Sequence, residues 1–85
     1  MLDLMVTRWL DRASGLAIEA VASYEIFVFA VRRPGGECLN RQGGFEVEPS
    51  PSNRDQAFLE RCRWSDFGEA ARALEKAAES KRENK

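Results

Sequence analysis

The sequence predicts an α+β fold in which an antiparallel β-meander of three to four strands packs one face against a C-terminal helix. Three observations predict it: an apolar strand-like run at residues 24–31, two Gly-Gly pairs placed as turns after it, and a capped amphipathic segment at about residues 66–82. Successive strands followed by a helix are typical of the α+β class. The 85 residues are expected to form a single domain, 1–85, because a chain of this length supports one small core.

The C-terminal helix is predicted from its first turn and its apolar stripe. Asp66 precedes Glu69 by the capping-box spacing, so the Asp66 carboxylate can accept a hydrogen bond from an amide of the first turn. Small apolar residues then recur at helical spacing on one stripe, which lets the helix approach a sheet closely. The stripe consists of Phe67, Ala70, Ala71, Leu74, Ala77 and Ala78.

Residues 24–31, with the sequence YEIFVFAV, are predicted to form a strand because they are aromatic and β-branched and a proline follows closely. Both of its faces are apolar, with Tyr24, Ile26, Val28 and Ala30 on one side and Phe27, Phe29 and Val31 on the other. Such a strand needs cover on both sides, and the C-terminal helix can supply only one.

The two Gly-Gly pairs are predicted to turn the chain. Pro34 fixes φ for the first turn, and glycine supplies the positive φ that such turns need. The segment 37–41 between the pairs has the length of a short strand, and FEVE at 45–48 follows the second pair. A phosphate-binding loop would need a helix N-terminus directly after the glycines, so the pattern favours a β-meander over a phosphate site.

Two segments allow alternative interpretations. Residues 49–55 are a loop by composition. Residues 56–64 alternate as a strand would, and we expect a strand there rather than a short helix capped by Asn53. Residues 2–24 show a helical stripe, and we expect a second helix there; the alternative is an extra β-hairpin that turns at DRASG, residues 11–15.

The inventory of reactive side chains is short. The chain has no histidine, and Cys38 and Cys62 do not form a Cys-x-x-Cys motif, so we predict no catalytic residue, cofactor or metal site. Cys62 is expected to be a small core residue. Glu46, Glu48 and Glu60 could converge on a divalent cation across neighbouring strands, but a solvated sheet face is the favoured interpretation.

Charge and hydropathy limit the surroundings. The formal net charge is −1, so no global basic field draws the protein to nucleic acid or anionic lipid. No apolar run is long enough to span a membrane, and the first residues do not resemble a secretory signal. We therefore expect a cytoplasmic protein with reduced thiols.

The expected function is that of a small non-catalytic protein-interaction module, such as an accessory or inhibitor protein of phage or mobile-element type. The alternative is a compact nucleic-acid-binding regulator that uses an arginine-bearing sheet face. If the N-terminal segment is a hairpin, apolar residues stay exposed, and a homodimer or a docked protein partner is expected to cover them. The candidate partner-binding residues are Phe27, Phe29, Arg32, Arg33, Arg41, Arg61 and Arg63.

Overall fold

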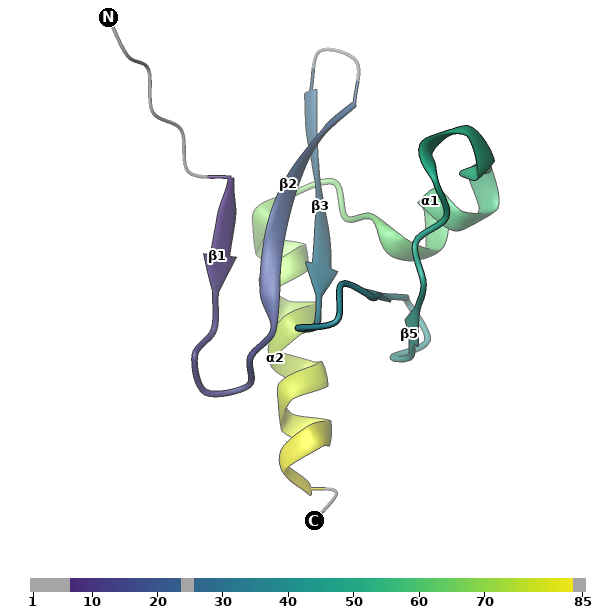
Figure 1. The fold of residues 1–85 in the computed structure, drawn as a ribbon. Coiled ribbons are helices and arrows are strands. Elements are labelled where there is room, and N and C mark those ends of the chain that lie inside the picture. The colour runs from purple at the N-terminus through teal and green to yellow at the C-terminus, as the bar shows by residue number, and fades with distance from the viewer. Residues whose placement is uncertain (1–6, 24–25, 84–85) are drawn as a thin grey trace, which may run out of the picture.

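The computed structural model describes residues 7–23 and 26–83, and of Ser23, Ile26, Pro51 and residues 80–83 it describes only the backbone. It has the predicted α+β architecture, a five-stranded antiparallel meander in the order β1-β2-β3-β4-β5 followed by two helices (Figure 1). Two of its five strands, β1 and β2, form the N-terminal hairpin that was the alternative prediction for that segment. Its elements are β1 (Arg8–Leu10), β2 (Ala17–Ser23), β3 (Ile26–Arg32), β4 (Cys38–Leu39), β5 (Phe45–Glu46), the 3₁₀ turn η1 (Pro51–Asn53), α1 (Gln56–Cys62) and α2 (Phe67–Glu83).

The N-terminal segment forms a hairpin, so the expected helix is wrong over the described residues 7–23, and residues 2–6 and 24 of that prediction lie outside them. β1 and β2 pair in antiparallel register, with Trp9 opposite Ile18. The turn between them is closed by a hydrogen bond from the Asp11 amide to the Leu16 carbonyl at 2.8 Å. β2 pairs with β3 along its full length, and this pairing outweighs the helical preference of the alanines in β2. It satisfies the backbone hydrogen-bonding groups of β2 and buries apolar side chains of the two strands together.

The central strand is confirmed over Ile26–Arg32; Tyr24 and Glu25 lie outside the described residues. β3 pairs with β2 along its whole length, and Arg32 pairs with Cys38 of β4. At the middle of β3 its other edge is occupied by Trp64, which exchanges two backbone hydrogen bonds of 2.8 Å with Phe29. This bridge brings the segment between the two helices against the sheet.

Both Gly-Gly pairs lie in turns, as predicted. In each pair one glycine adopts the left-handed backbone, Gly36 at φ +97° and Gly43 at φ +90°. The second turn is also stabilised by Asn40, whose Oδ1 accepts hydrogen bonds from the amides of Gln42 and Gly44, each at 3.0 Å. The glycines therefore reverse the chain before β4 and before β5.

Residues 56–62 form the short helix α1, so the strand expected over 56–64 is wrong. The reason is the cap: the Asp55 carboxylate accepts a hydrogen bond from the Phe58 amide at 2.8 Å. The alternative prediction of a helix was right, but it named Asn53 rather than Asp55 as the cap. Helical spacing then places Phe58 and Cys62 on one face, where both are buried against Cys38 of β4.

The helix α2 is confirmed together with its cap. The Asp66 carboxylate accepts a hydrogen bond from the Glu69 amide at 2.8 Å, while the Glu69 side chain accepts one from the Ser65 hydroxyl at 3.2 Å. Figure 1 shows α2 running along one face of the sheet, behind β2 and β3. Its buried stripe of Ala70, Leu74 and Ala78 packs on the main core, whose other members are Leu16, Ile18, Val31, Leu39 and Trp64. None of the described helices is long and apolar enough to cross a bilayer.

Candidate functional site

The face of the sheet opposite α2 carries an ion network centred on Glu48. The Glu48 Oε1 atom accepts hydrogen bonds from Arg32 at 3.0 Å and from Arg63 at 2.6 Å. Its Oε2 atom accepts one from Arg54 at 2.5 Å. Arg32 also binds Glu19 of β2 at 3.0 Å. The network therefore ties β2 and β3 to the chain on both sides of α1.

Burial of Glu48 would by itself raise the pKa of its carboxyl group. Hydrogen bonds from Arg63 and Cys38, together with the charges of Arg63 and Arg32, outweigh burial and lower that pKa to about 2. The Arg63 side chain is only 6% exposed, so Glu48 neutralises a guanidinium that water barely reaches. This carboxylate is a structural counter-ion and stays ionised at neutral pH.

Both cysteines lie next to this network, and both thiols are free and buried. Arg32 donates a hydrogen bond to the Cys38 sulfur at 2.9 Å, and the Cys38 thiol donates one to Glu48 at 3.2 Å. Burial, followed by the hydrogen bond to Glu48, raises the pKa of Cys38; burial and the nearby Glu46 raise that of Cys62 to about 12. Protonated, buried thiols are poor nucleophiles, and the core role predicted for Cys62 is confirmed.

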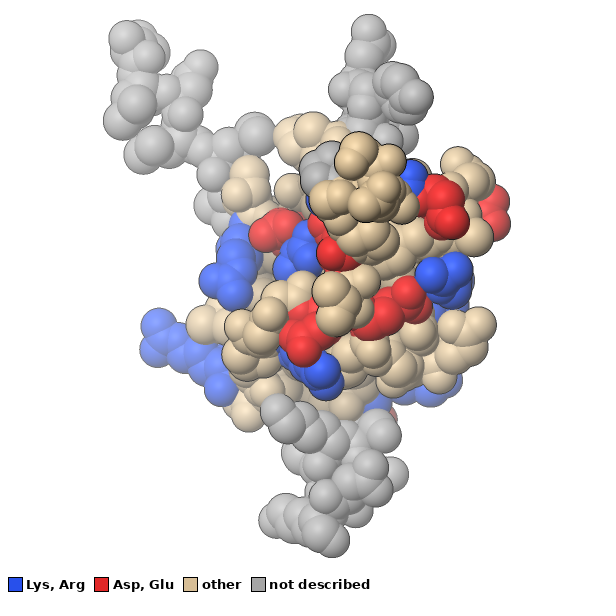
Figure 2. Space-filling model, turned by 45° about the vertical axis from the view of Figure 1, so that its right-hand side comes forward, with Lys and Arg blue, Asp and Glu red and all other residues tan. Residues whose placement is uncertain are grey.

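The other predicted arginines also have partners within the molecule. Arg61 makes two hydrogen bonds to Glu46, at 3.1 and 2.9 Å. Arg33 pairs with Glu37 at 2.9 Å and lies over the ring of Phe45. Figure 2 shows basic and acidic side chains interspersed on the side of α1 and β5.

Arg41 differs from these arginines because it binds backbone rather than carboxylate. It donates hydrogen bonds to the carbonyls of Glu60 at 2.7 Å and Arg63 at 2.8 Å. Its guanidinium carbon lies 5.3 Å from the ring centre of Trp64. Arg41 thus fixes the second Gly-Gly turn to the end of α1.

The predicted carboxylates are not brought together. Glu46 binds Arg61 and Asn40, Glu48 binds its arginines, and Glu60 accepts a hydrogen bond from Gln56 at 3.3 Å. Within residues 7–23 and 26–83, no three His, Cys, Asp or Glu side chains are grouped so that they could hold a metal ion.

Four aromatic side chains form a patch, which we call the aromatic patch, on the α2 side of the sheet near the start of α2. The rings of Trp9 and Phe67 meet edge to face at 4.9 Å, and Phe29 contacts Phe67 at 5.9 Å and Trp9 at 6.4 Å. Phe27 lies two residues before Phe29 on the same strand face. Phe27 is 43% and Phe67 40% exposed, so the patch reaches solvent.

The structure thus places Phe27 and Phe29 on the side of the sheet that carries the patch, and it engages the predicted arginines in hydrogen bonds within the chain. The sequence interpretation missed two members of the patch. Trp9 had been placed on the stripe of an N-terminal helix, and Phe67 on the buried stripe of α2. The hairpin alternative for the N-terminal segment could have revealed Trp9, because it sets Trp9 opposite Ile18, on the same face of the sheet as Phe29.

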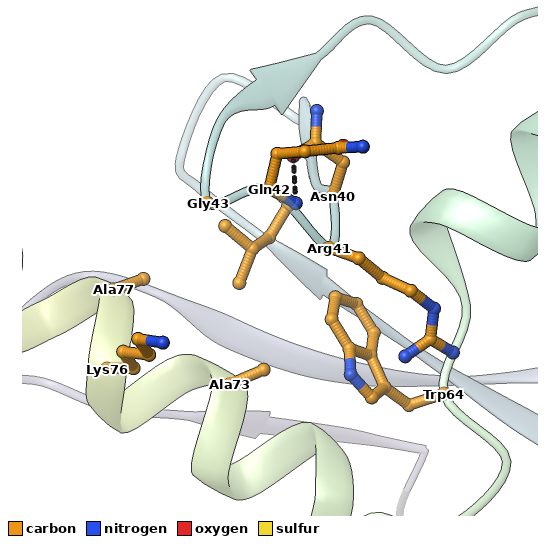
Figure 3. A pocket seen from close by; sticks show the side chains of 9 residues that line it. Asn40, Arg41, Gln42, Gly43, Trp64, Ala73, Lys76 and Ala77 are labelled. Carbon is orange, nitrogen blue, oxygen red and sulfur yellow. Dashed lines mark hydrogen bonds between the residues drawn. The ribbon is translucent and has the colours of Figure 1, made fainter.

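Two grooves run along opposite flanks of α2. The Trp64 groove, of about 360 Å³, lies between α2 and the second Gly-Gly turn. Figure 3 shows Arg41 beside the Trp64 ring, with Lys76, Ala73 and Ala77 facing them from α2. The residues that line this groove include Arg41 and Lys76 but no carboxylate, so it suits an anionic group.

The β1 groove, of about 430 Å³, lies on the other flank, between α2 and β1. Its charged lining residues are Asp11 and Glu75, and no lysine or arginine lines it. The two grooves therefore have charges of opposite sign.

The chain matches no protein-family model, and comparisons with curated proteins and with solved structures gave no significant match. Arguments about function therefore rest on the residues described above.

Proposed function

We propose that the protein is a small non-catalytic interaction module that binds a protein partner through the aromatic patch. The observation that carries the proposal is the exposure of Phe27 and Phe67, which lie on the same side of the sheet as the packed rings of Trp9 and Phe29. Aromatic side chains, phenylalanine included, are enriched in the cores of protein interfaces relative to the rest of the surface. Phe27 and Phe29 were predicted as partner-binding residues, and Trp9 and Phe67 add to them.

The charges of the sheet favour a protein partner over nucleic acid. Arg32, Arg61 and Arg63 would have to contact phosphates, yet each binds a carboxylate of its own chain. Releasing them would leave Glu46 without its arginine partner and Glu48 with Arg54 alone. A partner that covers apolar rings does not require that exchange.

The small size of the chain and its apolar patch fit an accessory or inhibitor protein of phage or mobile-element type that acts on a larger complex. We further propose that it works in the cytoplasm, where the thiols of Cys38 and Cys62 stay reduced.

The test is affinity purification from native lysate with the wild-type chain, Phe27→Ser and the control Val47→Ser. Val47 is 79% exposed and lies outside the patch, so its substitution removes an even more exposed apolar side chain away from the proposed site. We expect a protein partner that survives nuclease treatment, is retained by the control and binds Phe27→Ser at least about tenfold more weakly. Loss of the partner on nuclease treatment, or equal retention by both variants, would contradict the proposal.

A second copy of the chain is one form that this partner could take, and the hairpin at the N-terminus favours it because the patch is not covered within the described part of the molecule. Sedimentation equilibrium at micromolar concentration tests this form. A wild-type dimer that Phe27→Ser converts to a monomer identifies a homodimer. A wild-type monomer assigns the patch to a different protein.

A further inference from the structure

We propose a second binding site, which shares only Trp9 with the aromatic patch, at which an extended polypeptide segment that alternates basic and apolar residues adds to the open edge of β1. Two independent observations support it. One is the direction of the backbone groups of β1, and the other is the acidic groove that runs beside that edge.

The register of the first hairpin fixes which backbone groups face outward. Thr7 accepts a hydrogen bond from the Ala20 amide at 2.7 Å, and the Asp11 amide donates one to Leu16 at 2.8 Å. Because bonded and non-bonded residues alternate along an antiparallel ladder, the amides and carbonyls of Arg8 and Leu10 point away from β2. Within the described residues, no strand pairs with that side of β1.

The β1 groove lies on the α2 side of this edge. A strand added to β1 would direct every second side chain over the groove. The floor there is apolar and half-buried or buried, and Asp11 and Glu75 supply negative charge. The floor residues are Trp9, Ile18, Leu74 and Ala78.

Lysine and arginine fit this groove better than purely apolar side chains do. Their aliphatic stems can cover the floor while their charged ends reach Asp11 and Glu75. Arg72 lies one helical turn before Glu75, near Asp66 at the start of α2. The hydrogen bond from the Glu69 amide is the largest cause that lowers the pKa of Asp66, and the charge of Arg72 lowers it further.

The opposite face of the added strand would meet a different surface. Leu10 points to that face and is 55% exposed. Every second residue of the partner segment would therefore be apolar and pack against Leu10. The two faces together define a segment with basic residues on one side and apolar residues on the other.

The probe is an acetylated eight-residue peptide of alternating lysine and valine, titrated into the full chain and followed by NMR and amide hydrogen exchange. We expect saturable binding that slows exchange of the Arg8 and Leu10 amides and leaves the Trp9 amide, which already faces β2, unchanged. A peptide of alternating glutamate and valine should bind at least about tenfold more weakly because it meets like charge.

Two variants separate the edge from the groove. Leu10→Pro removes the Leu10 amide, which points away from β2, so it breaks no hydrogen bond to β2. Leu10→Ala is the control, because it removes the side chain and keeps the amide. The proline variant should bind the lysine peptide about tenfold more weakly than the alanine variant. Glu75→Lys, at an exposed helix position, cancels the net negative charge of the groove and should weaken binding of the lysine peptide about tenfold. Equal binding of both peptides, no saturable binding, or pairing of β1 with a second copy would overturn the proposal. Phe27→Ser should leave this binding unchanged, so failure here is distinguishable from failure at the aromatic patch.

Discussion

The two faces of the sheet are covered by different chemistry. On one face, α2 places an alanine-rich stripe and Leu74 against apolar strand residues. On the other, the small cluster of Cys38, Phe58 and Cys62 is joined by guanidinium groups that Glu48 holds in place. A short chain can thus cover both faces of a strand that is apolar on each side: one long helix covers one face, and a small cluster with paired charged side chains covers the other. The difference teaches that arginines near a sheet can be part of its packing rather than of a binding surface.

The largest effect should come from removing the centre of the ion network. Glu48→Gln leaves Arg63 buried without a counter-ion, and breaking a buried ion pair costs about 3–5 kcal/mol. Urea unfolding of the variant should show this loss in the free energy of unfolding. Glu60→Gln is the control, because Glu60 is exposed, and it should change that free energy by no more than about 0.5 kcal/mol. A similar small change in Glu48→Gln would show that the network adds nothing to stability.

A slightly smaller effect is expected on the helical face. Leu74→Ala removes a buried side chain from the main core and should cost about 2–4 kcal/mol. The control is Leu59→Ala on α1, where the leucine is exposed. Thermal melts should separate the two variants clearly. An unchanged melting temperature in Leu74→Ala would mean that α2 is not docked on the sheet in solution.

The two faces should also respond differently to acid. Hydrogen bonds from Arg61 and Asn40 lower the pKa of Glu46 to about 2, and Glu48 has a pKa of about 2 as well, against an ordinary value of 4.5. Because both folded-state pKa values are depressed, the stabilisation is complete above the ordinary pKa and is lost as pH falls from about 4.5 to about 2.

Urea midpoints measured from neutral pH down to about 2 test this expectation. Glu48→Gln should lose part of the acid dependence, whereas Leu74→Ala should keep the wild-type slope because it removes no carboxylate. Equal slopes in both variants would contradict the separation of the two faces.

The smallest effects concern the turns that lead into β4 and β5. Gly36→Ala and Gly43→Ala place a side chain on a left-handed backbone and should each cost about 1 kcal/mol. Gly44→Ala is the matched control, because its φ is not positive and the added carbon would meet Asn40 only at ordinary contact distance, 3.6 Å. Thermal melts of the three variants are the measurement. Equal losses in Gly43→Ala and Gly44→Ala would mean that the positive φ is unimportant.

The sequence predicted those parts of the fold whose signals are local. The cap at Asp66, the turns at the Gly-Gly pairs and the strand at Ile26–Arg32 each depend on neighbouring residues. Residues 7–23 and 56–62 were assigned to the wrong element because their apolar residues fit both periods, and only tertiary pairing and the Asp55 cap decide between them.

The candidate sites were predicted less completely, because they join residues that are far apart in sequence. Nothing in the order of the residues pairs Glu48 with Arg32 or Arg63, so the arginines were assigned to a partner. Phe27 and Phe29 were predicted together as partner-binding residues because they share one strand face. Trp9 joined them only through the hairpin that the sequence interpretation did not favour.

The paired backbone bonds between Phe29 and Trp64 close a longer loop than the pairings of neighbouring strands do. The β1–β2 and β2–β3 pairings close short loops, so they carry little entropic cost. The Phe29–Trp64 bridge instead encloses β4, β5 and α1, and α2 begins just beyond it. Closing this long loop therefore delivers α2 to the sheet, and we expect chain topology rather than helix formation to limit the folding rate.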